Sequence, residues 1–190
     1  CKSMLPEEVA SIIIPLHLIT GCDHTSGFYG HGKKSVLQKV IDKPEARELI
    51  AHVGQTLELE EEVSEDMTAF VLSYVYAEKE DITCGQARAS KWRKQKKKST
   101  MRLPPDKDTL THHFKRVNYL TYCQMHFILS EHPSPIENGW QIVNGKCRPV
   151  RNTLPPLPNQ LNPQNYADEN SSDSSDDESE CGDSTGSEED

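Results

Sequence analysis

The sequence predicts a mainly α-helical domain with a small C-terminal β-hairpin and a disordered acidic tail. Apolar residues recur at helical spacing through much of residues 1–150. Asn144-Gly145 separates two short strand-like runs, which is a strong signal for a two-residue hairpin turn at about 140–150. Residues 168–190 contain eleven Asp and Glu but no Lys or Arg. Since such a segment has too little apolar surface to fold, we expect residues 151–190 to form a disordered tail, Pro/Asn-rich and then acidic and Ser-rich.

The first helical elements are predicted from proline positions and apolar spacing. Pro6, followed by two glutamates, is typical of a helix start. Pro15 should kink or divide that element, because proline lacks the amide that a helix interior requires. A helix is predicted over 34–43 from the spacing of its apolar residues. Pro44 begins the next helix, which should end at Gly54.

Two further helices complete the predicted domain. One has an apolar face formed by Val63, Met67, Phe70, Val71 and Tyr74. The other spans 109–129 and is capped by Asp108 or Thr109. We assign these core residues to its inner face: Leu110, Phe114, Val117, Met125 and Ile128. The polar residues of that helix are expected on an outer face: His112, His113, Lys115 and Arg116.

Residues 77–107 are polar and are predicted to form a basic connection between helices. They include "KWRKQKKKSTMR" at 91–102, with seven basic residues in twelve. A solvated linker and a functional basic patch both fit this composition. The density of charge also fits a nuclear-import signal, so we expect an intracellular, nuclear protein. The candidate nucleic-acid contacts are Lys91, Trp92 (which would stack on a base), Arg93, Lys94, Lys96, Lys97 and Lys98.

Charge and cysteine content narrow the class of protein. The net charge of −9 describes the tail, because the remainder carries 21 basic and 19 acidic residues, a net charge of +2. Nucleic-acid binding is therefore compatible with the composition. Six widely spaced cysteines with no C-x-x-C pair fit reduced intracellular thiols. The longest apolar run is too short for a membrane span, so no membrane partner is expected. Because the chain begins with Cys, we interpret it as a piece of a longer protein.

The glycine-rich stretch "TGCDHTSGFYGHGKKSVLQKV" at 20–40 holds four of the ten glycines. Glycines let the backbone approach a partner closely, and the free N–H groups of the helix that follows attract phosphate. Two lysines add sequence-independent attraction. The pattern is that of a helix–hairpin–helix-like motif closed by Val36, although a plain glycine-rich turn also fits. The candidate contacts are Gly30, Gly32, Lys33, Lys34 and Ser35.

Residues 16–40 resemble the C-terminal core of flap-endonuclease-type, PIN-like nucleases. The shared order is apolar helix, Gly-x-Asp, polar link, Gly-x-Gly-x-Lys and helix, which that family arranges as a helix–three-turn–helix, here at about 10–43. The chain is also similar to a group of uncharacterised animal proteins with Gly-Cys-Asp-Thr-Thr-Ser, Leu-Pro-Pro, Arg-x-Asn-Tyr and Gly-Trp motifs. The matching residues are Gly21-Cys22-Asp23, Leu103-Pro104-Pro105, Arg116 to Tyr119 and Gly139-Trp140, so this similarity spans roughly residues 10–145.

The resemblance implies a function and a few site residues. Asp23 would be one carboxylate of a cluster that binds Mg²⁺ or Mn²⁺, and residues 30–34 would hold a DNA backbone with a monovalent cation at the loop carbonyls. The family's metal cluster needs several carboxylates, but only Glu7 and Glu8 precede Asp23. We therefore expect a DNA-binding portion of a nuclease, incomplete and inactive as this chain alone. His24 and His31 depart from the family's pattern.

Other interpretations remain open at this point. The chain would alternatively be a non-catalytic helical interaction module, derived from a mobile element, in which the glycine loop is structural. Cys22 and His24 with His112 and His113 would make a metal site only if the fold gathered them, since none has zinc-finger spacing. A Cys22–His nucleophilic pair would require the same. The acidic tail would solubilise the protein, or compete with DNA for its basic residues.

Overall fold

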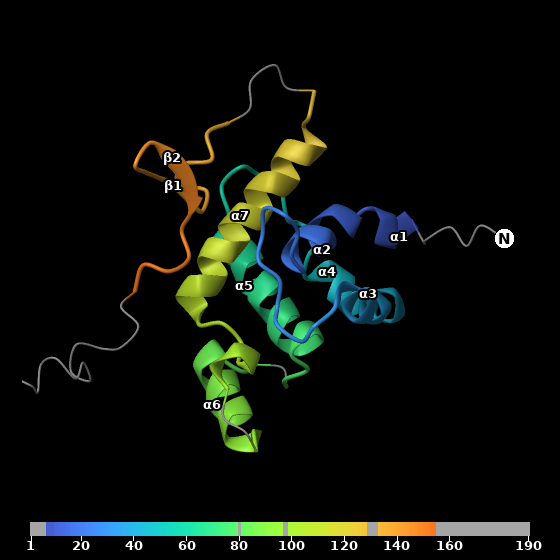
Figure 1. Ribbon diagram of the computed structural model, residues 1–190. Helices are drawn as coiled ribbons and strands as arrows, with labels where there is room; N and C mark the ends of the chain where they lie inside the picture. The colour runs from blue at the N-terminus through green and yellow to red at the C-terminus, as the bar shows by residue number, and fades with distance from the viewer. Residues whose placement is uncertain (1–6, 80, 97–98, 129–132, 155–190) are drawn as a thin grey trace, which may run out of the picture. The chain divides into compact units, whose positions relative to one another are not determined.

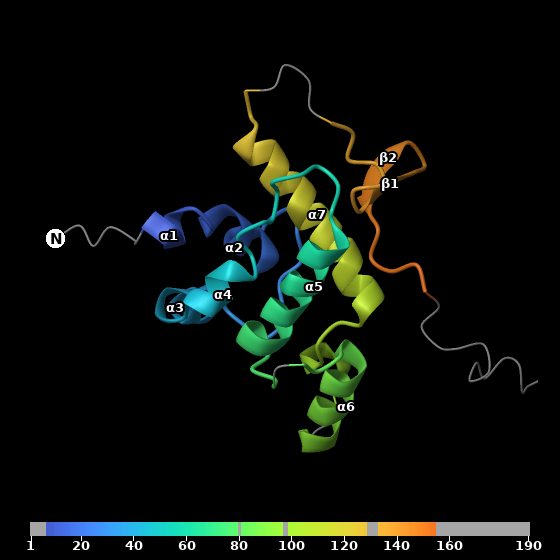
Figure 2. The ribbon, with the colours of Figure 1, turned by 180° about the vertical axis from the view of Figure 1, so that it is seen from behind.

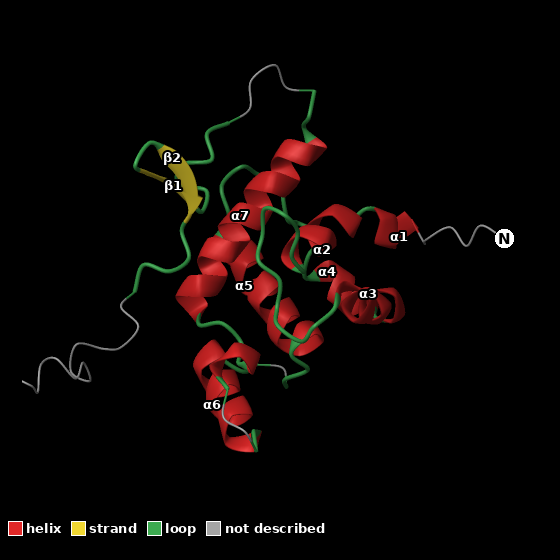
Figure 3. Ribbon diagram, in the orientation of Figure 1, coloured by secondary structure: helices red, strands yellow, loops and turns green. Residues whose placement is uncertain are grey.

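The computed structural model describes residues 7–79, 81–96, 99–128 and 133–154. Lys97, Lys98 and the tail from residue 155 lie outside the described residues. The described part is mainly helical with one small two-stranded antiparallel sheet, as predicted (Figures 1 and 3). None of its helices is both long and apolar enough to cross a bilayer. The elements are α1 Glu7–Ala10, α2 Ile13–Ile19, α3 Lys33–Asp42, α4 Pro44–Glu48, α5 Glu61–Phe70, a π-helical continuation η1 Val71–Val75, α6 Cys84–Lys94, a 3₁₀ turn η2 Thr100–Arg102, α7 Lys107–Met125, β1 Trp140–Val143 and β2 Lys146–Pro149.

The longest helix, α7, packs against α2 and α5, as both views show (Figures 1 and 2). Most residues of the apolar faces predicted for the helices meet in one core. Its largest fully buried side chains include Phe70, Phe114, Leu18, Ile50 and Met67. Burial of a side chain of this size stabilises a fold by roughly 1.5–3 kcal/mol. The core formed by α7 and its neighbours is therefore the stable framework that holds the loop between α2 and α3.

Proline divides the first helical element, as predicted, but the break lies upstream of the proline itself. The α1 and α2 helices separate at Ser11 and Ile12, while Pro15 lies within the first turn of α2. Pro15 has no N–H with which to bond the Ser11 carbonyl four residues earlier. The amide of Leu16 starts the new helix by donating to Ile12 O at 3.0 Å.

The prediction of a basic connection over 77–107 is wrong for residues 84–94, which form α6. Thr83 and Gln86 make a reciprocal capping box at its start. Only two of its residues, Cys84 and Ala87, are buried. The helix therefore has too narrow an apolar stripe to be recognised by periodicity, and its capping residues were the only local signal.

Two expectations for the last helix are also wrong. The helix begins earlier, with Asp106 as its cap, and Met125 and Ile128 are 50% and 85% exposed rather than in the core. His113 and Arg116, expected on a polar face, are each only 4% exposed. Hydrogen bonds offset the cost of their burial: His113 Nε2 lies 3.0 Å from Ile19 O, and the Arg116 guanidinium donates to the carbonyls of Gly139 and Val150.

The hairpin has the predicted turn. Asn144 and Gly145 have φ of 52° and 72°, which matches the turn that two-residue hairpins favour. The strands pair from Trp140 opposite Pro149 to Val143 opposite Lys146. The hairpin also docks on the helices as expected, through the two Arg116 hydrogen bonds to its flanking residues.

Candidate nucleic-acid interface

The loop over 20–32 begins at a helix end whose last four carbonyls all have donors. In Figure 1 it is the blue trace between α2 and α3. The last carbonyls of an α-helix lack partners within the helix. Here each receives a side-chain donor: Thr20 Oγ1 to Leu16 O at 2.7 Å, Lys33 Nζ to His17 O at 2.7 Å, Thr25 Oγ1 to Leu18 O at 2.7 Å, and His113 Nε2 at 3.0 Å from Ile19 O. The start of the loop is thereby fixed to the core.

The first half of the loop is a tight turn with Asp23 at its tip. The amide of Cys22 donates to Thr25 O at 3.0 Å. A Cβ on Gly21 would lie 2.5 Å from Gly27 Cα, so these two glycines let the loop close on itself. Asp23 is exposed and has no hydrogen-bond or ion-pair partner in the described part of the chain.

The glycines in the second half of the loop are exposed and are not packed against other residues. Gly30 and Gly32 are exposed, and a Cβ at either would meet nothing within 4 Å. Gly30 has φ of +81°, a conformation that favours glycine. Gly32 has φ −82° and ψ 147°, which any residue adopts. Neither backbone conformation nor packing therefore requires glycine at position 32, where glycine also serves as an ordinary N-cap residue.

The start of α3 leaves its amides without acceptors. Gly32 is the N-cap and supplies no side chain, and the first turn contains no acid. The amides of Lys33 and Lys34 have no acceptor among the described residues. Two cations at the positive end of a helix are electrostatically unfavourable. An anion bound at this helix start would relieve that repulsion and satisfy the amides.

The two lysines at this helix start have different roles. The Lys33 ammonium turns back to α2, where it donates to His17 O and lies 3.4 Å from Thr20 Oγ1. Lys34 is exposed and makes no hydrogen bond or ion pair with any described residue. Ser35 is exposed in the same turn, and Val36 is buried, as the apolar spacing of this helix predicted. Lys34 is therefore the available cation at the start of α3.

The fold brings part of the basic stretch to the glycine loop. A cavity of about 620 Å³ is lined by Tyr29, Gly30, His31, Lys91, Gln95 and Arg102. Lys91 is partly engaged, since its ammonium donates to Tyr76 O at 2.9 Å and lies 3.5 Å from Glu78 Oε1. Arg102 was not among the predicted contacts, although it belongs to the same run of basic residues. Its side chain has no hydrogen-bond or ion-pair partner in the described region, so it is the more available cation of the two.

His31 replaces the apolar residue that the family pattern has between its two glycines. Its ring packs on Tyr76, with 4.5 Å between ring centroids. Burial lowers the pKa of His31, and the nearby Lys91 and Lys39 lower it further. The imidazole is therefore neutral at physiological pH and serves as a packing group, as an apolar residue would.

The other candidate nucleic-acid contacts among the described residues of the basic stretch do not line the cavity beside Gly30. Arg93 and Lys94 are exposed in the last turn of α6, and Lys96 is exposed just beyond it. Trp92 is 39% exposed. They add positive charge to the part of the chain that follows Lys91, but none of them lines the cavity beside Gly30.

The described residues do not form a metal centre around Asp23. Within them, no three His, Cys, Asp or Glu side chains are grouped so as to hold a metal ion. The alternative set of Cys22, His24, His112 and His113 is not gathered either. His113 is bound to Ile19 O, and His112 Nε2 lies 3.7 Å from Asp108. Asp23 alone does not fit a site for Mg²⁺ or Mn²⁺.

Comparison of the chain with protein-family models, with curated proteins and with solved structures gives no match. The similarity to PIN-like nucleases therefore rests on the sequence motifs alone.

Proposed function

We propose that the loop over 20–32, the start of α3 and the adjoining basic residues bind the sugar–phosphate backbone of DNA. The observation that carries this proposal is the helix start at Gly32, which is exposed, uncapped and free of acids. Its free amides suit phosphate oxygens, and Gly32 leaves room for a backbone to approach. Lys34 in the first turn of α3 and Arg102 in the cavity beside Gly30 supply positive charge, and such contacts carry no base specificity.

We further propose that the chain is the DNA-binding portion of a PIN-like, metal-dependent, structure-specific nuclease. This part of the proposal is supported by the motif order around Asp23 and by the exposure of that carboxylate. A hard divalent cation needs several oxygen ligands, so Asp23 would serve only with carboxylates other than those of the described residues. The chain on its own is proposed to bind DNA rather than to cut it. A monovalent cation at the loop carbonyls and a nuclear location stay predictions.

A non-catalytic helical interaction module is the second candidate, and one observation favours it. Several lysines near the loop already have structural partners: Lys33 binds a carbonyl of α2, whereas Lys39 and Lys91 bind Tyr74 O and Tyr76 O at the end of η1. If all cations near the loop acted in this way, the glycine loop would be purely structural. Lys34, which has no such partner, separates the two candidates.

The test measures the affinity of the full chain for labelled DNA by fluorescence anisotropy, over salt from about 50 to 200 mM. Lys34→Ala should weaken binding several-fold and reduce the slope of log affinity against log salt by about 1. Lys107→Ala is the matched control, since Lys107 is also exposed in the first turn of a helix, but one already capped by Asp106. If affinity ignores salt, or if both variants behave alike, the proposed DNA-binding surface is wrong.

A further inference from the structure

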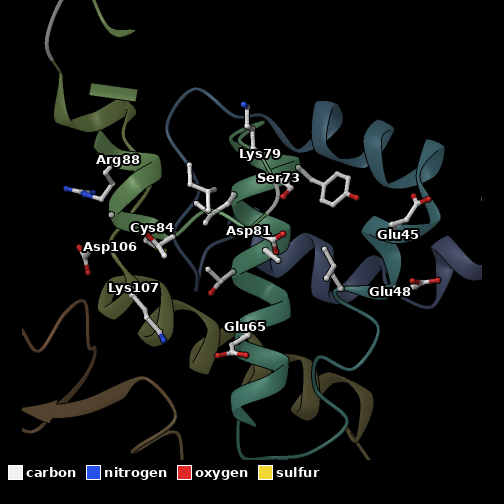
Figure 4. A pocket seen from close by; sticks show the side chains of 18 residues that line it. Glu45, Glu48, Glu65, Ser73, Lys79, Asp81, Cys84, Arg88, Asp106 and Lys107 are labelled. Atoms are coloured by element: carbon white, nitrogen blue, oxygen red, sulfur yellow. The ribbon is translucent and has the colours of Figure 1, made fainter. Parts of the chain in front are cut away.

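A second surface, remote in sequence from the glycine loop, has the features of a protein-docking groove. A cavity of about 820 Å³ lies among α4, α5 with η1, and the starts of α6 and α7 (Figure 4). It shares no lining residue with the cavity beside Gly30. Its wall is mostly apolar, with Leu49, Ala69, Leu72, Tyr74, Ile82 and Cys84 among the lining residues.

One side of this cavity carries carboxylates without partners. Glu45 and Glu48 extend from α4 and Glu65 from α5, across from the side chains of α6 and α7 (Figure 4). These three glutamates are exposed, and their carboxylates have no hydrogen bond or ion pair in the described part of the chain. Across the groove, Arg88 is already bound to Pro104 O at 2.5 Å, and the Asp106 carboxylate caps α7.

A neighbouring cavity of about 530 Å³ extends the groove. Both cavities are lined by Glu48 and Leu49, so they adjoin along α4 and α5. The first is lined by five carboxylates and the second adds three more, against three Lys or Arg side chains in total. Burial and repulsion by Glu62 raise the pKa of Asp66, which reflects this crowding of negative charge. We call the two cavities together the acidic groove.

We propose that the acidic groove docks a basic, amphipathic helical segment of a protein partner. Apolar side chains at i, i+3, i+4 and i+7 of such a segment would cover the apolar wall. Its Lys and Arg side chains would face Glu45, Glu48 and Glu65, so that the charges are complementary. Nucleic acid is a poor occupant because the excess of carboxylates repels phosphate. The groove spans two adjoining cavities, which suits an elongated polypeptide better than a compact small molecule.

The probe is a fluorescein-labelled helical peptide of about 18 residues with Leu at the apolar positions and Lys elsewhere. Binding to the full chain is measured by anisotropy at physiological salt. The double variant Glu45→Gln/Glu48→Gln should weaken binding about fivefold or more. Glu7→Gln/Glu8→Gln removes two exposed carboxylates from α1, outside the groove, and should leave binding unchanged. Ala69→Arg places bulk and positive charge at an exposed position of the groove and should weaken binding about tenfold.

Four outcomes would overturn the proposal. The first is that both double variants lose affinity equally, and the second is that Ala69→Arg keeps full affinity. The third is that a peptide with Glu in place of Lys binds equally well. The fourth is that the peptide does not bind and sedimentation shows that a second copy of the chain covers the groove. The melting temperature of each variant, measured by circular dichroism, must match that of the parent. If Ala69→Arg does not fold, Ala69→Gln is measured in its place. DNA affinity should be the same in all groove variants, so failure here is distinct from failure of the DNA-binding proposal.

Discussion

The two ends of the loop over 20–32 differ in whether the backbone groups of the adjoining helix have hydrogen-bond partners. At the end of α2, the last four carbonyls each receive a donor from a side chain outside the helix, one from the C-cap residue Thr20 and three from Thr25, Lys33 and His113. At the start of α3, the first amides receive no acceptor from any described side chain. The loop is thus firmly held on one side and left with exposed donors on the other.

The free amides at the start of α3 do not reflect a general lack of capping side chains in this chain. The two longest helices do have caps: Thr83 and Gln86 close the start of α6, and Asp106 closes the start of α7. The start of α5 has no side-chain cap either, but two glutamates lie in its first turn, whereas the first turn of α3 has no acid. A helix start with glycine at its N-cap is less stable than one with a capping side chain by a few tenths of a kcal/mol. Under the proposed function, the open start of α3 would receive a phosphate, and three stability measurements test the contrast between the two helix ends.

The largest effect is expected at His113, which holds the end of α2. Burial lowers its pKa from 6.5 to about 4, so the folded protein keeps the ring neutral where the unfolded chain would protonate it. Stability from this group is complete above pH 6.5 and is lost as pH falls toward 4, by up to roughly 3 kcal/mol. Urea unfolding from pH 7.5 to 4.5 should show the loss, and His113→Gln, which keeps a donor for Ile19 O, should reduce it.

The variant is needed because burial also lowers the pKa of His31 and of His112, which contribute to the slope in the same pH range. The difference between parent and His113→Gln isolates the buried ring. Identical pH profiles for the two proteins would show that His113 is not held neutral against Ile19 O.

A smaller effect is expected at Thr25, the donor to Leu18 O. Thr25→Val keeps the shape of the buried side chain but removes its hydroxyl, so it should lower the free energy of unfolding by about 1–2 kcal/mol. Ser26→Ala is the matched control, because Ser26 is exposed and makes no hydrogen bond within the described region. Urea unfolding of both variants measures the difference. A Thr25→Val protein as stable as Ser26→Ala would mean that the end of α2 does not depend on this donor.

The smallest effect has the opposite sign and concerns the start of α3. Gly32 has the extended backbone of an N-cap residue and open space for a side chain. Gly32→Ser should therefore cap the free amides and raise the free energy of unfolding by a few tenths of a kcal/mol. Thermal or urea unfolding measures the gain. Destabilisation would show that the amides already have partners, which would remove the contrast between the two helix ends.

The sequence predicted those features whose causes are local. The apolar stripes of α3, α5 and α7 and the Asn144-Gly145 turn depend on residues a few positions apart. The burial of His113 was not predictable, because its partner Ile19 O is 94 residues away in the chain. The α6 helix was missed since its stripe is narrow.

The candidate site was predictable only in part for the same reason. Glycines and lysines at 30–34 identified the loop, and the structure places these glycines at an exposed, open helix start. That Lys33 and Lys91 bind carbonyls of other elements depends on tertiary contacts. The position of Arg102 beside Gly30 likewise required the path of the chain after α6.

The most direct test of the central claim is the DNA affinity of Gly32→Asp, measured together with its stability. An aspartate there would cap the amides and favour the helix dipole, while occupying and repelling the place of a phosphate. Gly85→Asp, at an exposed and open glycine in the first turn of the already capped α6, is the control for added charge. We predict that Gly32→Asp is more stable than the parent yet binds DNA at least about tenfold more weakly, with Gly85→Asp near the parent affinity. Undiminished DNA binding by a stabilised Gly32→Asp protein would contradict the account.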